Sequence, residues 1–348
     1  MDEIFIYKQI NMLDLKNEGI NVLSLFDGIS CAKLALERAG IKVNKYYSSE
    51  IDKTALAIQN YHYGNDSNFI QLGDITKING HDLADEIDLI IFGSPCTNLT
   101  SINPKDRRGL EGTQSKLFYE ALRVLKGIYV MQPNHKKLYY LMENVASMRN
   151  VDRDKITAEF ENIFDETNLL KIDSALICPG HRRRLYWTNI PNVEVPEPNQ
   201  LKYSNILDNG FVDRDKANVI LSGNVTLTNG IFRHYKMNIG NIIFKDKKFA
   251  ELPTEEKLLQ YPKILEDSNY IGKSGSCPNE LDFPNGCYRH PSIKEYSRIM
   301  TIPDNYIDEV FGVSKSEKLK TIGLAFSVDV VAHLLRGLKN KEAFSLST

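Results

Sequence analysis

Short apolar runs alternate with helical patterns through the first half of the chain. Strands are predicted at residues 20–26, 45–52, 69–76, 87–96 and 137–145, since each run is apolar and ends at turn-forming residues. Apolar side chains at helical spacing predict helices at residues 31–41, 53–63 and 116–130. Residues 174–180 and 183–190 are expected to pair as a terminal hairpin. This alternation predicts an α/β fold with a doubly wound, mainly parallel sheet that binds ligands at the carboxyl ends of its strands.

The pattern changes after residue 191. A proline-rich stretch, "PNVEVPEPNQ", opens a region of short apolar runs among Asn and Gly residues. Residues 328–338 are again helical in pattern. The chain is therefore divided into residues 1–191, which hold the sheet, residues 192–290, which form a smaller domain, and residues 291–348, which return to the first domain.

Composition excludes some classes of protein. Of the 348 residues, 42% are hydrophobic and 25% charged, which is ordinary for a globular chain. No apolar run is expected to span a membrane, and the N-terminal residues lack a signal-peptide pattern. Five cysteines without a CxxC pair indicate a reducing, intracellular setting. Because the formal net charge is only -2, any surface for nucleic acid must be a local patch.

Polar or small residues follow the first three predicted strands. The turn "FDGIS" follows the first strand, Glu50 the second and Asp74 the third. A carboxylate at the second position is suited to hold ribose hydroxyls, although carboxylates also end strands simply because turns are wet. A single glycine, Gly28, falls short of the GxGxxG pattern that holds a pyrophosphate. This favours an adenosine cofactor without a pyrophosphate, such as S-adenosylmethionine.

Cys96 follows the fourth strand in "GSPCTNLT" and precedes a loop rich in basic residues and glycine. A buried structural thiol beside a solvated loop is the simplest interpretation of a lone cysteine. The alternative is a nucleophile, because the thiolate is a reactive group and a loop with glycines can close over a substrate. Gly109 and Gly112 are the expected hinges.

Five motifs together resemble the DNA (cytosine-5)-methyltransferase family. They are "VLSLFDGIS", "GSPC", "ENV", "RRRLYW" and "FSVDVVAHLL", in the order of that family between residue 21 and about residue 338. The catalytic-loop motifs are similar to the animal de novo branch, because the usual bacterial pattern has glutamine after the cysteine. The resemblance implies a Rossmann-like S-adenosylmethionine-dependent methyltransferase sheet with a smaller target-recognition domain at residues 192–290.

The resemblance also implies catalytic roles. Cys96 would add to C6 of cytosine and make C5 nucleophilic. Glu143 would hydrogen-bond ring N3 and the exocyclic amine, and Arg184 would hold O2. Arg182 would steady the catalytic loop or a phosphate. His181 and Trp187 are expected to be structural.

Further residues are assigned to the cofactor and to the substrate. The residues implied for S-adenosylmethionine are Phe26, Asp27, Gly28, Ser30, Glu50, Ile51, Asp74, Ile75, Pro95, Phe326 and Val328. Those implied for the substrate are Ser94, Asn144, Arg107 and Arg108, where Asn144 shapes the loop that holds Cys96 and the arginines touch phosphates. The chain departs from the family pattern at Ala32, where a glycine is usual, and at Phe326, where the bacterial family has asparagine.

The smaller domain is expected to read bases in the major groove. Its candidate contacts, each equally explained by surface solubility, are Arg233, His234, Lys236, Lys245, Lys247 and Lys248. A metal site at Cys277 and Cys287 is not expected, because partner ligands at zinc spacing are missing.

The resulting hypothesis is an enzyme that methylates cytosine C5 in double-stranded DNA, as a monomer on DNA, after flipping the base out of the duplex. Methylation of a tRNA and a non-catalytic DNA-binding regulator are the alternatives. Intact Cys96, Glu143 and Arg184 count against the regulator, and "GSPCTNLT" counts against the tRNA enzyme. A cytoplasmic bacterial or phage setting is expected, with a cognate restriction enzyme as candidate genetic partner and no membrane.

Overall fold

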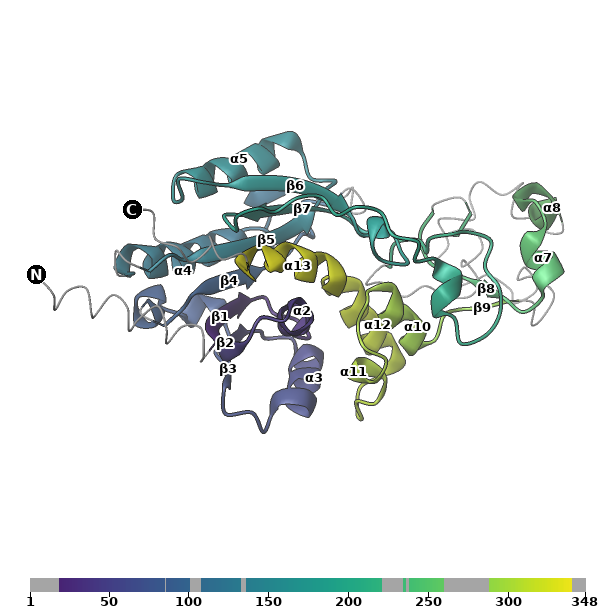
Figure 1. The fold of residues 1–348 in the computed structure, drawn as a ribbon, viewed down its shortest axis with the longest axis horizontal. Coiled ribbons are helices and arrows are strands. Elements are labelled where there is room, and N and C mark those ends of the chain that lie inside the picture. The colour runs from purple at the N-terminus through teal and green to yellow at the C-terminus, as the bar shows by residue number, and fades with distance from the viewer. Residues whose placement is uncertain are drawn as a thin grey trace, which may run out of the picture. The chain divides into compact units, whose positions relative to one another are not determined.

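The computed structural model describes residues 19–84, 86–100, 108–132, 136–220, 234–235, 238–259 and 288–339. Its main feature is a seven-stranded sheet with strand order β3-β2-β1-β4-β5-β7-β6 (Figure 1). The strands are β1 (Ile20–Leu25), β2 (Val43–Ser49), β3 (Phe69–Gln71), β4 (Leu89–Phe92), β5 (Tyr139–Val145), β6 (Asn168–Asp173) and β7 (Arg183–Thr188). Strands β1 to β5 pair in parallel with one another, and β7 is antiparallel to both β5 and β6. The predicted doubly wound α/β sheet is confirmed.

Helices connect the parallel strands. These are α2 (Cys31–Ala39), α3 (Lys53–Tyr63), α4 (Leu117–Met131) and α5 (Asn150–Glu161), with the short 3-10 helices η1 (Ile75–Lys77), η2 (Gly80–Leu83) and η3 (Gly109–Glu111) between them. Near the C-terminus, α13 (Val328–Leu335) continues into η10 (Arg336–Lys339). Helix α13 packs against α2, and the ion pair between Arg38 and Asp329, at 2.6 Å, joins the two helices.

Side-chain alternation along the strands divides the core into two layers. On one face, α4 and α5 cover the strands, and the Phe160 ring of α5 stacks on Tyr140 of β5 with centroids 4.5 Å apart. Trp187 is fully buried on this face and donates to Thr157 at 2.9 Å, so its expected structural role is confirmed. On the other face, Gln59 of α3 reaches Ser48 of β2.

The chain forms two compact units. The sheet unit comprises the residues up to Asp173, Arg183–Pro196 and the residues from Val328 on. The second unit comprises Ser174–Arg182 and Glu197–Ser327. The expected boundary between the smaller domain and the C-terminal segment was at residue 290. In the structure, residues 291–327 belong to the second unit, and the sheet unit resumes at Val328, where α13 begins.

The second unit contains little regular sheet. Its elements are η4 (Ser174–Leu176), η5 (Tyr203–Ile206), β8 (Ile243–Phe244), α7 (Lys247–Glu251), α8 (Thr254–Leu259), β9 (Tyr288–Arg289), α10 (Ile293–Ile299), α11 (Asn305–Asp308) and α12 (Lys315–Leu324). Two capping boxes, Ser292 with Glu295 and Ser314 with Glu317, fix the starts of α10 and α12. Strands β8 and β9 pair in an antiparallel two-stranded sheet.

The expected terminal hairpin is wrong in its first strand. Residues 174–180 form η4 and a turn, and the partner of β7 is β6, which the sequence analysis did not predict. Serine and proline favour turns over a strand here, and Ser174 Oγ closes this turn by donating to the Gly180 carbonyl at 2.6 Å.

The stretch Lys315–Lys339, which comprises α12, α13 and η10, is long and apolar enough to cross a membrane by length and composition. About two thirds of its apolar window, 67%, is buried inside the protein, as is typical of a core helix.

Candidate active site

The carboxyl ends of the parallel strands form the edge at which the predicted site residues meet. Strand order 3-2-1-4-5 reverses direction between β1 and β4, and a ligand of such a sheet binds at this switch point. Because β7 is antiparallel, its first residues lie at the same edge, where Arg184 pairs with Val145 of β5.

The turn after β1 has an unusual backbone. Phe26, Gly28 and Ser30 all have positive φ, at 53°, 57° and 60°. Such a conformation costs a non-glycine residue on the order of 1–3 kcal/mol, and strain of this kind persists where the surroundings enforce it. A side chain at Gly28 would meet nothing within 4 Å, so the space above this turn is open. The half-buried ring of Phe26 borders the turn.

Asp27 is directed into the protein. Its carboxylate accepts hydrogen bonds from Ser24, Ser30, Tyr46 and Ser48 at 2.5–2.8 Å, and from Gln59 at 3.1 Å. Burial raises the pKa of Asp27, and the hydroxyl hydrogen bonds partly offset this rise. Because five donors bind its two oxygens, the Asp27 carboxylate stabilises the turn through hydrogen bonds inside the protein. It has no free acceptor for a ligand.

Glu50 joins the turn to the end of β2. Its Oε2 accepts the Gly28 N–H at 2.7 Å, and Oε1 accepts the N–H groups of Ile51 and Asp52 at 2.7 and 2.8 Å. The side chain of Ile51 is 68% exposed beside this carboxylate. An apolar surface next to a fixed acceptor suits a nucleoside, whose base is flat and whose ribose donates hydrogen bonds.

Asp74 lies three residues after the end of β3. It caps η1 by accepting from Thr76 N–H at 3.0 Å and from the Thr76 hydroxyl at 2.9 Å. These hydrogen bonds lower the pKa of Asp74. The neighbouring Ile75 is buried and packs in the core. An ionised acceptor therefore lies at this strand end.

Cys96 lies four residues beyond the end of β4 and is only partly buried against the core of the sheet unit. Its carbonyl accepts the N–H groups of Leu99 and Thr100, at 2.9 and 3.0 Å, and so opens a tight turn. Asn144 fastens the preceding residues, because its Nδ2 donates to the carbonyl and hydroxyl of Ser94 at 3.2 and 3.1 Å. Ser94 is thus engaged by a neighbouring strand end, and Pro95 follows it half-buried.

Glu143 and Arg184 come together across β5 and β7. The Arg184 Nε lies 2.7 Å from Glu143 Oε1, and both side chains are largely buried, with 14% and 10% exposure for Arg184 and Glu143. Arg183 points to solvent and pairs with Asp173 at 3.1 Å. A carboxylate and a planar guanidinium at a strand edge can together bind a ring that carries both hydrogen-bond donors and an acceptor.

Arg182 precedes β7 and belongs to the second unit. Its guanidinium is buried and donates to the Gly323 carbonyl at 3.1 Å. Phe326, which is half-buried, also belongs to the second unit, whereas Val328 is fully buried at the start of α13. Only Val328 of these three is placed with the sheet.

The loop after Cys96 is described at both ends. Arg107 lies outside the described residues, and Arg108 is exposed with its Nη2 3.4 Å from the Thr113 hydroxyl. Gly109 and Gly112 were expected to be hinges, but both are tightly packed. A Cβ at Gly112 would lie 2.2 Å from Asn98 Cγ, so a glycine at this position allows the Asn98 side chain to pack directly against the backbone.

The expected surface role of His234 is wrong. The ring is fully buried and its Nε2 lies 3.1 Å from Asp213, which also accepts from the Tyr235 hydroxyl at 2.6 Å. Lys257, 1% exposed, lies 3.4 Å from the same carboxylate. This buried polar cluster lies within the second unit. Lys245, Lys247 and Lys248 are exposed, and Arg233, Lys236, Cys277 and Cys287 lie outside the described residues.

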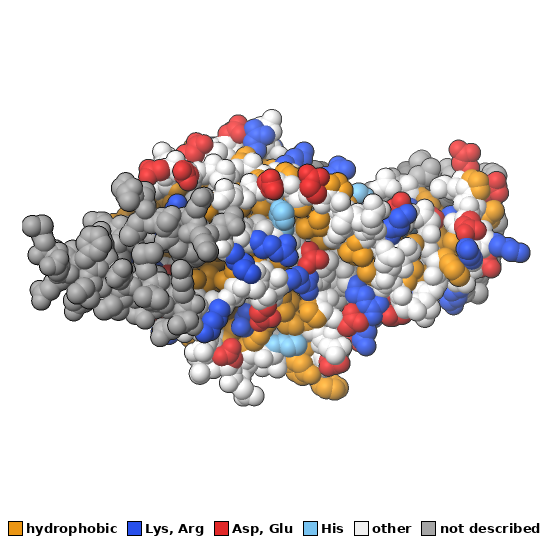
Figure 2. All heavy atoms as spheres, viewed as in Figure 1, with side chains coloured by type: hydrophobic (Ala, Val, Ile, Leu, Met, Phe, Trp, Pro, Cys, Tyr) orange, Lys and Arg blue, Asp and Glu red, His pale blue; other side chains and the backbone are white. Residues whose placement is uncertain are grey.

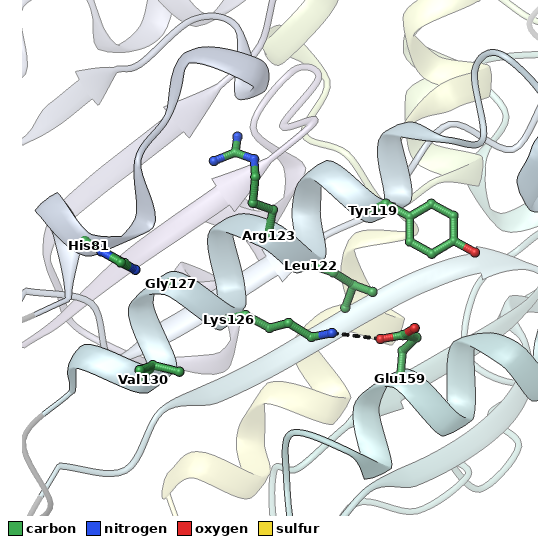
Figure 3. Close-up of a pocket in the computed structure, with 8 residues that line it drawn as sticks. All are labelled: His81, Tyr119, Leu122, Arg123, Lys126, Gly127, Val130 and Glu159. Atoms are coloured by element: carbon green, nitrogen blue, oxygen red, sulfur yellow. Dashed lines mark hydrogen bonds and ion pairs between the residues drawn. The ribbon is translucent and has the colours of Figure 1, made fainter.

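A surface groove of about 490 Å³ lies within the sheet unit (Figure 3). Its lining comes from η2, α4 and α5, and Lys126 pairs with Glu159 across it at 2.9 Å. None of the predicted site residues lines it. Acidic and basic side chains are interspersed on the face seen in Figure 2, as the near-neutral charge leads one to expect. In the part of the chain that the structure describes, no group of three metal-ligating side chains is found.

Several supporting residues were missed by sequence analysis. Gln59 is the clearest, since its amide also donates to the Gly28 carbonyl at 2.8 Å. It lies on the buried side of α3 together with Ala55 and Ile58. A polar residue on the apolar stripe of a helix is a signal that could have identified it. Asp152 carries the same signal, because it lies on the buried side of α5 together with Ile156 and Phe160, whereas Asn98 lies outside any helix.

The fold and this edge define a doubly wound α/β protein that gathers carboxylates, an arginine and a cysteine at the carboxyl ends of its parallel strands. The family described as C-5 cytosine-specific DNA methylase matches residues 20–340, and the chain belongs to this family. The resemblance found in the motifs is confirmed.

Curated relatives cover parts of the chain. The "DNA (cytosine-5)-methyltransferase DRM2" of Oryza sativa subsp. japonica is 37% identical over 33% of this chain and 21% of its own length. The "Type II methyltransferase M1.ScrFI" of Lactococcus lactis subsp. cremoris is 27% identical over 57% of this chain and 51% of its own. The "Orphan methyltransferase M.Rho11sI" of Bacillus phage rho11s is 29% identical over 65% and 40%. The chain thus spans about half or less of these relatives.

Solved structures share the fold over most of the chain. A Dnmt2 mutant from Spodoptera frugiperda has a TM-score of 0.61 and 16% identity, covering 92% of this chain and 100% of its own. The Dnmt2 methyltransferase of S. pombe has a TM-score of 0.58 and 17% identity, covering 92% and 98%. Such low identity supports the Rossmann-like fold alone.

Proposed function

We propose that this protein transfers a methyl group from S-adenosylmethionine to C5 of a flipped-out cytosine in duplex DNA, through a covalent bond between Cys96 and C6. One observation carries the proposal. Cys96 follows β4, while Glu143 and Arg184 meet at the end of the adjacent β5, at the same edge as the turn of Phe26 and Gly28.

The residues of the turn fit S-adenosylmethionine. The space above Gly28 is open, Glu50 provides a fixed carboxylate, and Ile51 provides an exposed apolar side chain. In this proposal Glu50 accepts from the ribose, Asp74 accepts from the adenine amino group, and Phe26 and Pro95 border the ligand. The cofactor contact of Phe326 stays a prediction from its motif. Asp27 and Ser30 support the turn, and Ile75 and Val328 pack behind it. When bound, the cofactor supplies an electrophilic methyl group.

Cys96 would act as the nucleophile. Its thiolate sulfur forms a bond to C6, and the ring electrons that this releases make C5 nucleophilic. After C5 is methylated, loss of the C5 proton returns an electron pair to the ring and the sulfur–C6 bond breaks. The hydrogen bonds from Asn144 to Ser94 hold the chain immediately before the thiol.

Glu143 and Arg184 would hold the base. A carboxyl group at Glu143 can donate to or accept from N3 and the exocyclic amine, and the Arg184 guanidinium can donate to O2. Since the two side chains already contact each other at 2.7 Å, they are preorganised for this task.

Duplex DNA is the proposed substrate, since the matched family is described as a DNA methylase and a base within a duplex must leave the stack to reach Cys96. Arg107 and Arg108 would touch phosphates. The bacterial and phage origins of two relatives support a cytoplasmic bacterial or phage enzyme, with a cognate restriction enzyme as a genetic partner to be sought.

The experiment offers duplex DNA and tRNA at equal nucleotide concentration with S-adenosylmethionine labelled in its methyl group. The expected result is incorporation into DNA, at positions that sequencing after chemical conversion identifies as 5-methylcytosine. Transfer should fall steeply with added salt, because phosphate contacts release counterions. Greater incorporation into tRNA would favour the RNA enzyme, and no incorporation into either would favour a binding protein.

A further inference from the structure

The segment that carries Cys96 is hydrogen-bonded to the residues that follow positions 101–107. The carbonyl of Asn98 accepts the N–H of Gly109 at 3.1 Å, and its side-chain Oδ1 accepts the N–H groups of Gln114 and Ser115 at 3.2 and 3.3 Å. Asn98 is only 2% exposed. The two ends of the loop are therefore tied to each other.

Asp152 of α5 fastens the returning end to the sheet unit. Its Oδ1 accepts the N–H of Leu110 at 3.2 Å, and its Oδ2 accepts from Arg149 Nε at 2.7 Å. Asp152 is 2% exposed, and Leu110 is 1% exposed in the core. A buried carboxylate that accepts a backbone N–H from a loop fixes the position of that loop.

The geometry at Gly109 shows how close this contact is. Gly109 has φ +69°, and a Cβ would lie 2.0 Å from Arg149 Nη2 and 2.3 Å from Asp152 Oδ1. Only glycine allows both this backbone conformation and this approach.

A short path of hydrogen bonds continues to the thiol residue. Asp152 holds Leu110, the adjacent Gly109 holds the carbonyl of Asn98, and Asn98 lies inside the turn whose first carbonyl belongs to Cys96. We propose that Asp152 is a positioning residue for methyl transfer, which acts by accepting the Leu110 N–H and thereby fixing the turn of Cys96. This inference rests on the proposed function.

A purely structural role would make the ion pair with Arg149 the important interaction. Two substitutions separate the roles. Asp152→Asn keeps an oxygen acceptor for Leu110 but loses the ion pair, whereas Asp152→Ala loses both. Asp154→Asn is the matched control, because Asp154 lies on the same helix, is exposed and pairs with the neighbouring Arg153 at 2.7 Å.

The readouts are the single-turnover rate of covalent adduct formation on duplex DNA carrying 5-fluorocytosine, the affinity for S-adenosylmethionine, and the melting temperature. Asp152→Ala should slow adduct formation by about ten- to a hundredfold, because small misplacements of a nucleophile cost this much. Asp152→Asn should stay within about threefold of the wild type, although both variants melt at lower temperature. Cofactor affinity should not change in any variant.

The inference is overturned if Asp152→Ala forms the adduct at the wild-type rate, or if Asp152→Asn slows it as much as alanine does. Should Asp152→Ala not fold, Arg149→Met replaces it. This variant keeps the Leu110 acceptor but removes the ion pair and the hydrogen bond from Arg149 Nη2 to the Arg108 carbonyl at 3.4 Å. It should retain the rate, and a tenfold loss would contradict the proposal that the Leu110 acceptor fixes the turn of Cys96. Absence of any adduct in the wild-type protein would instead refute the proposed function.

Discussion

Arg184 contacts Glu143 across two antiparallel strands, with Nε 2.7 Å from Oε1. The contact is diagonal, since Arg184 pairs in register with Val145 and Glu143 with Tyr186. Each side chain therefore sets the orientation of the other, and a substitution at one position leaves the other charge largely buried without this partner.

Substitution of Glu143 and substitution of Arg184 should have different effects on adduct formation and on DNA affinity. Glu143→Gln should slow adduct formation by about 10²–10⁴-fold while DNA affinity is kept, because proton transfer is lost but the shape remains. Arg184→Ala should weaken both rate and affinity. Trapping kinetics and a DNA-binding titration measure these effects. Arg183→Ala is the control, since Arg183 is 73% exposed and should leave both unchanged.

Cys96→Ser tests the nucleophile. A fluorine at C5 cannot leave as a cation, so 5-fluorocytosine DNA should trap the wild-type enzyme after one methyl transfer, in a complex that survives denaturation. The serine variant should lose this complex almost entirely, because a hydroxyl is far less ionised than a thiol near pH 7. Cys31→Ala should retain it. A complex of undiminished yield with Cys96→Ser would identify another nucleophile.

Glu50→Ala tests the cofactor site. The affinity for S-adenosylmethionine should fall by about 1–3 kcal/mol, as is typical for the loss of hydrogen bonds to a charged group. Part of this loss comes from Gly28, whose N–H loses its acceptor on Glu50. Calorimetry measures the change, with Glu37→Ala of the exposed face of α2 as the control. Equal affinities would remove Glu50 from the site.

The buried cluster of the second unit predicts a pH dependence of stability. Burial lowers the pKa of His234, so the unfolded chain takes up a proton on this residue at a higher pH than the native protein does. The free energy of unfolding should therefore fall as the pH drops below about 6.5, by up to about 1.4 kcal/mol per pH unit.

Asp213 acts at lower pH. Burial alone would raise the pKa of Asp213, but the hydrogen bonds from His234 and Tyr235 and the charge of Arg214 hold it well below its usual range. Its contribution to the free energy of unfolding is present above about pH 3.9 and is lost as the pH falls further.

Denaturant titrations at pH 7.5 and 5.5 test the prediction for His234. The difference in the free energy of unfolding between these two pH values should be smaller in His234→Gln than in the wild type. His181→Gln, at an exposed position, should behave as the wild type does.

Sequence analysis located the parallel strands, because each contains a buried apolar run, but it extended the second, third and fourth strands by three to five residues beyond their observed ends. Glu50, Asp74 and Cys96 follow the ends of β2, β3 and β4 by one to four residues, and Glu143 lies within β5. It failed at residues 174–180, where an apolar run was taken for a strand although Ser174 and Gly180 close a turn.

The supporting contacts could not be predicted from spacing. Asn98 and Asp152 act through backbone N–H groups of residues that lie 11 to 42 positions away, and hydrogen bonds of this kind leave no periodic pattern. His234 was misplaced for a similar reason, because its buried partner Asp213 lies 21 residues earlier. Burial of a polar residue depends on its partner, and the partner is set by the tertiary fold.

The chain crosses between its two compact units four times, at residues 173/174, 182/183, 196/197 and 327/328. Ser174–Arg182 is thus a short strip of the second unit held between two strands of the sheet unit. A chimera that transplants only residues 197–327 from a relative would set a foreign module against the host's own strip, including the buried Arg182 that donates to Gly323. On the prediction that this unit recognises the target sequence, exchange of specificity between family members should therefore require two grafts made together, the large segment and this nine-residue strip.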